Sequence, residues 1–159
     1  MPTVARSRSI QVPARKVWEL VSDPHNLPRW WPETVRVEDV RGKVGSERCR
    51  FTQVFETKNG KAVRADYRCT AARENELMIW EQEIEGTPFE GFMRRAELEL
   101  RIDGGDAATV VTAEGRRRLR GLSRLGSPMM RRATGRTLAG ALEGIEDALG
   151  GGAVGEGAA

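Results

Sequence analysis

The sequence has little of what metal sites and disulfide scaffolds require: one histidine, His25, and two cysteines, Cys49 and Cys69, among 159 residues. A lone histidine excludes a zinc site built from several histidines, and the cysteines lack the spacing of metal ligands. Two cysteines are also too few for the disulfide framework of a small secreted protein. We therefore expect neither a metal site nor a cofactor.

Long apolar runs are missing as well. No stretch approaches the roughly 18 residues that a membrane-spanning helix needs. The N-terminal segment MPTVARSRSIQV lacks the apolar core of a secretory signal peptide, so the expected location is the cytoplasm. Hydrophobic residues make up 39% of the chain and charged residues 31%. These fractions are typical of a soluble globular protein of one domain.

Negative charge is absent from one segment of the chain. The net charge is only +3, but the charges are unevenly distributed. Residues 74–99 are rich in glutamate, whereas residues 115–136 carry eight arginines and no acidic residue. One interpretation is a solvated surface that needs no partner. The other is contact with an anionic membrane or a nucleic acid. The residues for such a contact are Arg116, Arg117, Arg118, Arg120 and Arg124.

The hydrophobic pattern predicts an α+β protein with a seven-stranded antiparallel sheet. A strand at 3–12 and a helix at 13–23 precede a strand at 34–40. Short turn sequences then separate five further strands, which indicates an antiparallel meander. These strands are predicted at 47–57, 61–72, 76–85, 89–102 and 107–118. A long helix follows from Ser127 to residue 149, with Gly150 as its C-terminal cap. Residues 1–149 form the predicted domain, and the Gly/Ala-rich tail 150–159 is expected to be disordered.

The stretch DPHNLPRWWPE, residues 23–33, holds three prolines and two of the four tryptophans. The prolines allow one short helical turn at most, so this stretch is a stiff connection. Together with its flanks, VPARKVWELVSDPHNLPRWWPETVRVEDV, it resembles the helix-grip superfamily of START and birch-pollen-allergen-like proteins, often labelled SRPBCC. It is most similar to the bacterial polyketide cyclase/dehydrase-type members. The residues that carry the resemblance, which extends over about residues 3–149, are Pro13, Val17, Trp18, Asp23, Leu27, Pro28, Trp30 and Pro32.

The resemblance implies a cavity between a curved sheet and the long C-terminal helix, with lipids, quinones or aromatic polyketides as ligands. Only some members of the superfamily catalyse a reaction. Side chains alternate between the two faces of a strand, so the parity of apolar residues predicts which ones face the cavity. On that basis Ala71 and Phe92 also point inward. The predicted ligand-binding residues are Trp30, Phe51, Gln53, Tyr67, Met78, Trp80, Gln82, Arg94, Leu98, Leu138 and Leu142.

Three details of this prediction have alternatives. An inward Arg94 requires a carboxylate, a cavity mouth or an anionic ligand, unless a strand bulge turns it outward. Trp30 either walls the cavity or plugs the core. Glycines at 135, 140 and 144 of the long helix indicate either close packing or open space, because glycine costs about 1 kcal/mol relative to alanine in a helix.

The turn KNG at 58–60 predicts the register of the hairpin around it. A three-residue loop with Gly60 in the left-handed conformation pairs residue 57 with residue 61. Phe51 then faces Tyr67, and Cys49 faces Cys69. We expect the two cysteines to be adjacent, reduced thiols.

The expected function is the binding of a hydrophobic or aromatic small molecule by a monomer or homodimer. A cyclase/dehydrase-type enzyme acting on a polyketide-like substrate is the first alternative, although no dedicated acid–base pair is recognisable and no catalytic residue is assigned. The second alternative is a partner-binding protein that uses the arginine-rich segment 115–136 on a membrane or ribosome.

Overall fold

The computed structural model of the protein describes residues 3–121 and 127–150. The first strand, β1 (Thr3–Ile10), leads into α1 (Ala14–Val21), the 3₁₀ turn η1 (Pro24–Asn26) and α2 (Leu27–Trp30). Six strands follow, with one further 3₁₀ turn, η2 (Pro88–Gly91), and then the long helix α3 (Ser127–Leu149). These strands are β2 (Thr34–Arg41), β3 (Arg50–Glu56), β4 (Ala62–Arg73), β5 (Leu77–Glu83), β6 (Met93–Gly104) and β7 (Thr109–Leu119).

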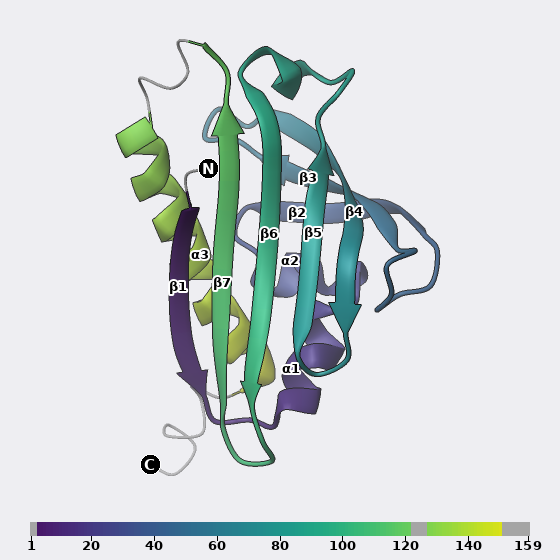
Figure 1. Ribbon diagram of the computed structural model, residues 1–159, viewed down its shortest axis with the longest axis vertical. Helices are drawn as coiled ribbons and strands as arrows, with labels where there is room; N and C mark the ends of the chain where they lie inside the picture. Colours follow the sequence, from purple (N-terminus) through teal and green to yellow (C-terminus); the bar gives the residue numbers. More distant parts are fainter. Residues whose placement is uncertain (1–2, 122–126, 151–159) are drawn as a thin grey trace.

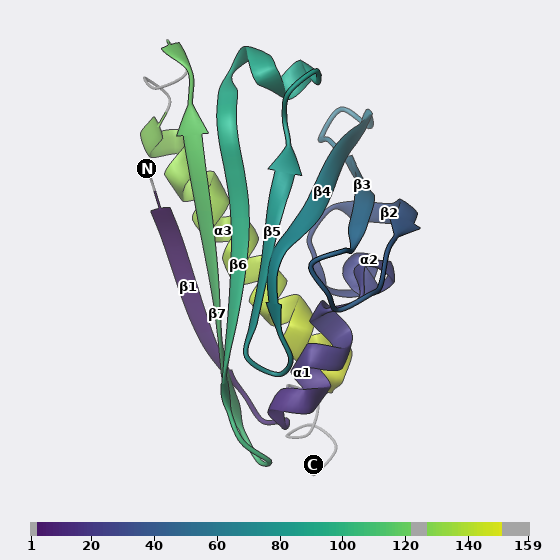
Figure 2. The same cartoon turned by 45° about the vertical axis from the view of Figure 1, so that its right-hand side comes forward.

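The seven strands form one antiparallel sheet in the order β1-β7-β6-β5-β4-β3-β2. Figures 1 and 2 show β1, β7, β6, β5 and β4 side by side, while β2 and β3 fold round at the other end. Helix α3 runs diagonally across the inner face, and α1 and α2 lie on the same side. This arrangement confirms the predicted helix-grip fold. Within the residues described here, no helix is both long and apolar enough to cross a membrane.

The connection between β1 and β2 is largely helical, with prolines at the start of its turns. Helix α1 follows Pro13 and buries its apolar stripe, which includes Val17 and Val21. The helix ends before Asp23, whose carboxylate accepts hydrogen bonds from the backbone N–H and the ring Nδ1 of His25 at 3.0 and 2.8 Å. The prediction of one turn at most is wrong, because η1 and α2 are two consecutive turns. A proline at the start of each turn is compatible with both, since the first N–H of a helical turn needs no internal acceptor.

The glycines of α3 lie at close contacts and not beside open space. A Cβ on Gly144 would lie 2.2 Å from the carbonyl oxygen of Trp30, and one on Gly140 would lie 3.0 Å from Cγ of Pro32. Gly135 faces the guanidinium of Arg6. On the same side, Arg8 Nη2 lies 2.9 Å from Glu146 Oε1 and ties the edge strand β1 to the helix. The glycines therefore allow α3 to approach α2 and β1.

The hairpin of β3 and β4 has the predicted loop. The backbone N–H of Thr57 donates to the carbonyl oxygen of Lys61 at 2.9 Å, and Gly60 has a φ of 76°. The register pairs Phe51 with Tyr67, as expected. Further along β4, a bulge between Cys69 and Ala71 shifts the parity, so that Ala72 pairs with Met78 and packs against the core. The prediction that Ala71 faces inward is wrong because of this extra residue.

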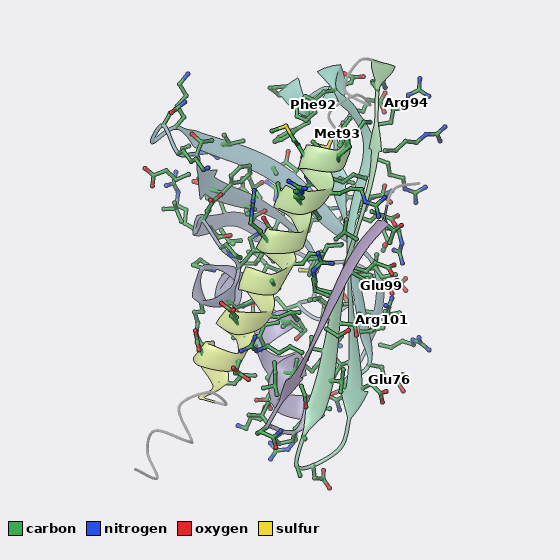
Figure 3. All side chains as sticks on the ribbon, turned by 90° about the vertical axis from the view of Figure 1, so that its left-hand side faces the viewer. Glu76, Phe92, Met93, Arg94, Glu99 and Arg101 are labelled. Atoms are coloured by element: carbon green, nitrogen blue, oxygen red, sulfur yellow. The ribbon has the colours of Figure 1, made fainter. Side chains whose placement is uncertain are left out.

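The start of β6 also differs from its prediction. Residues 88–91 form the turn η2, so the strand begins at Met93 and not at residue 89. Phe92 is 38% exposed, and Met93 takes the buried position. A register shift between Met93 and Arg95 leaves Arg94 exposed, at the end of the sheet seen in Figure 3. The predictions that Phe92 is buried and that Arg94 faces the cavity are therefore both wrong.

The outer face of the sheet is covered by ion pairs. Glu99 accepts hydrogen bonds from Arg101 and, at 2.9 Å, from Arg116. Glu81 lies 3.1 Å from Arg68. In Figure 3, Glu99 and Arg101 lie on the side of the sheet that faces away from α3. Much of the glutamate-rich stretch thus neutralises arginines of neighbouring strands, and the apolar residues are left for the inner face.

Candidate functional site

A cavity of about 70 Å³ lies between the inner face of the sheet, the connection 24–31 and the N-terminal half of α3. This volume is several times the roughly 10–15 Å³ that a single buried water requires. Eight of the eleven predicted ligand-binding residues line it. They are Trp30, Phe51, Gln53, Tyr67, Trp80, Gln82, Leu98 and Leu138.

One wall of the cavity is aromatic. The rings of Phe51 and Tyr67 stack with centroids 5.4 Å apart, and Trp80 meets Phe51 edge-on at 4.8 Å. Trp30 from α2 meets Trp31 edge-on at 5.6 Å on the opposite side. Both tryptophans of the connection line the cavity, and Trp30 also belongs to the hydrophobic core. Flat, rigid rings of this kind give an apolar ligand a large contact area.

Three predicted residues do not line the cavity. Met78 and Leu142 are 0% and 2% exposed, within the packed core. Their inward orientation is as predicted, but they sit further along β5 and α3, where sheet and helix are in contact. Arg94 is the third, because the bulge in β6 turns it outward.

Arg117, the one basic residue of the described cavity lining, is among the lining residues that the sequence prediction missed. It lines the cavity from β7, where it pairs with Ala96 of β6. Its parity is that of Val111 and Ala113, which are both buried, so continuing the alternation by four residues identifies it. The run of consecutive arginines concealed this signal, since a basic cluster is more typical of a solvated surface.

The sheet register brings Arg117 into one row with other polar residues of the inner face. Tyr67 on β4 pairs with Gln82 on β5. The register of β5 and β6, which pairs Glu81 with Glu97, places Gln82 beside Ala96. Ala96 in turn pairs with Arg117. Gln82 and Arg117 thus flank the small side chain of Ala96 on the cavity floor, and Tyr67 lies beyond Gln82 in the same row.

Some polar side chains of the cavity have a hydrogen-bond partner within the protein, and others have none. Gln53 Nε2 donates to Thr34 Oγ1 at 2.7 Å. By contrast, Gln82 Nε2 and Trp30 Nε1 are buried donors without an acceptor. Arg117 makes no ion pair or hydrogen bond with any residue that the structure describes. Burial raises the pKa of Tyr67, and the nearby charge of Arg117 only partly opposes this effect, so the phenol stays protonated at neutral pH.

The predicted arginine contact is divided among different surfaces. Arg116 points outward and is engaged by Glu97 and Glu99, whereas Arg117 points into the cavity. Arg118 and Arg120 are exposed, and Arg124 lies outside the described residues. In the same part of the chain, no group of three His, Cys, Asp or Glu side chains is placed to hold a metal ion.

Comparison with known proteins agrees with this architecture. Residues 1–150 match the model of a family described as polyketide cyclase / dehydrase and lipid transport. No curated protein matches the sequence. Among solved structures, a START superfamily protein from Mycobacterium smegmatis superposes with a TM-score of 0.75 at 16% identity, over 92% of this chain and 96% of its own. A protein from Thermus thermophilus gives 0.73 at 21% identity, over 93% and 97%.

A third structure is the di-domain ARO/CYC protein BexL from the BE-7585A biosynthetic pathway. It superposes with a TM-score of 0.74 at 20% identity, over 94% of this chain and 46% of its own. At such identities these likenesses establish the fold, whereas function depends on the side chains of the site.

Proposed function

Because the chain belongs to the polyketide cyclase / dehydrase and lipid transport family, we propose that its cavity binds a hydrophobic or aromatic small molecule. The observation that carries this proposal is the aromatic wall of Phe51, Tyr67 and Trp80, which lines the cavity between sheet and helix. Ligand sites of proteins are mostly apolar concavities with a few polar groups that fix orientation. The cavity has this composition.

Native mass spectrometry of the purified protein tests the proposal. We expect a fraction of the chain to carry the extra mass of one small organic molecule, which denaturation releases. Extraction and a second mass measurement then identify the compound. A chain that always appears at its bare mass, and that also binds no added apolar probe, contradicts the proposal.

Cyclase or dehydrase catalysis is a second candidate, favoured by a protonated phenol and a cation that line the same cavity. Tyr67 and Arg117 lie in the same row of the inner face, where they are positioned to stabilise a developing enolate oxygen. Incubation with a reactive linear β-polyketide analogue tests this candidate. If the phenol donates a proton, Tyr67→Phe retains substrate binding but lowers the rate; equal rates in both proteins exclude that role.

A further inference from the structure

Two donors of the cavity lining, Gln82 Nε2 and Trp30 Nε1, have no acceptor among the described residues. Gln82 is 7% exposed and Trp30 4% exposed. Leaving a buried donor without an acceptor costs about 1–3 kcal/mol. Because both residues line the cavity, an occupant is placed to supply the missing acceptors.

Arg117 adds an unneutralised positive charge to the same space. The lining contains one acidic residue, Glu97, but its carboxylate pairs with Arg95 at 2.6 Å and Arg116 at 3.4 Å on the outer face. The residues of α3 that line the same cavity are Thr134, Thr137 and Leu138, which carry no charge. A half-buried guanidinium without a carboxylate is costly unless a ligand supplies the negative charge.

The surroundings of the cavity strengthen this positive potential. A second, smaller hollow shares Gly115, Arg117 and Thr134 with the cavity and extends to Arg131. The exposed arginines of this region make no ion pair with any described residue; they are Arg118, Arg120, Arg131 and Arg132. A cluster of one sign of charge around a recess raises the local concentration of the opposite ion.

From these observations we infer that the ligand is an apolar ring system that carries an ionised oxygen, as a carboxylate, phenolate or enolate. This inference rests on the proposed function and specifies the ligand of the same site. The oxygen lies over Ala96, between Arg117 and Gln82, and the phenol of Tyr67 lines the same cavity beyond Gln82. Trp30 Nε1 donates from the opposite wall, and the ring packs against Phe51 and Trp80.

Two probes of the same ring size test the inference: 2-naphthoate, which carries a carboxylate, and naphthalene, which does not. We expect the wild type to bind both, with naphthoate bound more tightly. Arg117→Gln should weaken naphthoate binding on the order of tenfold, because a hydrogen bond to a charged group is lost. Naphthalene binding should stay unchanged in this variant.

Arg118→Gln is the matched control, since it removes the same charge from the next residue on the exposed face. We expect it to alter naphthoate binding by less than about twofold, because an exposed charge is screened by solvent and salt. If Arg118→Gln abolishes the preference as much as Arg117→Gln does, general surface charge explains it and the inference fails. If wild type and variants bind the two probes equally, the inference fails and the proposed function stands. If neither probe binds, both fail.

A second readout does not depend on the folding of the Arg117 variant. In ¹⁵N-labelled wild type, naphthoate should shift the Trp30 indole N–H and the Gln82 side-chain amide resonances, whereas naphthalene should leave the amide unshifted. Gln82→Met should weaken naphthoate binding and raise the melting temperature, because it removes an unsatisfied buried donor while keeping the side-chain volume. Unshifted indole and amide signals at saturating naphthoate overturn the inference.

Discussion

The backbone N–H of Cys69 donates to the carbonyl oxygen of Cys49 at 3.0 Å, which makes the two cysteines direct cross-strand neighbours, as predicted. Both are buried and neither is bridged. The Cys69 thiol donates to the carbonyl oxygen of Ala71 and lies 3.4 Å from the sulfur of Met78. Burial raises the pKa of both thiols, that of Cys69 to about 11.

These thiols should react only as fast as the fold opens, because the thiolate is the reactive form and both groups are held protonated. Labelling with iodoacetamide at neutral pH, followed by mass spectrometry, measures the rate. We expect slow modification in native buffer and rapid double modification in denaturant. Cys49→Ala serves as control, since it leaves one thiol to follow. Fast stoichiometric labelling of the native protein contradicts this expectation.

The glycines of α3 should differ in their response to alanine. In Gly144→Ala the new methyl group meets the backbone of Trp30, which cannot move aside, so we expect a loss of about 1–3 kcal/mol in unfolding free energy. In Gly135→Ala it meets the end of the flexible Arg6 side chain, so the helix should gain up to about 1 kcal/mol. Urea unfolding of both variants measures the difference. Equal effects argue against the close contact at Trp30.

Alanine variants of Trp80 and Met78 should distinguish an effect on ligand binding from an effect on core packing. Both lie on the inner face of β5, but only Trp80 lines the cavity. Each change to alanine should cost several kcal/mol of stability, about 2–5 for Met78 and 3–5 for Trp80. Only Trp80→Ala should also reduce the binding of the neutral fluorescent probe N-phenyl-1-naphthylamine. Fluorescence titration of both variants decides; parallel loss of binding in the two identifies Trp80 as a core residue.

Glu99 should contribute to the acid sensitivity of the fold. Burial tends to raise the pKa of its carboxyl group, but hydrogen bonds from Arg116 and Arg101 outweigh this and lower it below the ordinary value of 4.5. A carboxyl whose pKa is lower in the folded state stabilises the protein above about pH 4.5, and this stabilisation is lost as the pH falls through the folded-state pKa.

Glu99→Gln should therefore lower the melting temperature at pH 7 and make its decline below about pH 4.5 less steep than in the wild type. Glu85→Gln is the control, because Glu85 is exposed and makes no ion pair with a described residue. Melting temperatures measured across this range test the prediction. Parallel profiles for wild type and Glu99→Gln show that the ion pairs of Glu99 do not act on stability.

The parts of the fold that could be predicted depend on residues close together in the sequence, such as turn residues and alternating apolar residues. Gly60 in its loop set the register of β3 and β4, and this register placed Phe51, Tyr67 and both cysteines correctly. Alternation of apolar residues identified most of the cavity lining, because one face of an antiparallel strand is buried throughout.

The two bulges account for the errors. An extra residue at Arg94 or at residues 70–71 changes which side chains face inward, yet it leaves the composition of the strand unchanged. The inward position of Arg117 was missed for a different reason: the run of arginines around it concealed the alternation that identifies it. Its place beside Ala96 depends on a long-range pairing that only the strand order brings about. Local sequence does not specify such a pairing.

The contacts of α3 are unevenly distributed along its length, and this affects how the cavity can enlarge. Towards its C-terminus the helix touches Pro32 and the Trp30 carbonyl through Gly140 and Gly144, and Glu146 holds Arg8. Towards its N-terminus, Thr134 and Leu138 meet the cavity through side chains alone. The close contacts at residues 140–144 therefore hold this end of the helix against α2 and Pro32. We expect a ligand larger than the present space to be accommodated by a tilt of the N-terminal half of α3, with residues 140–144 and the core beneath them unchanged.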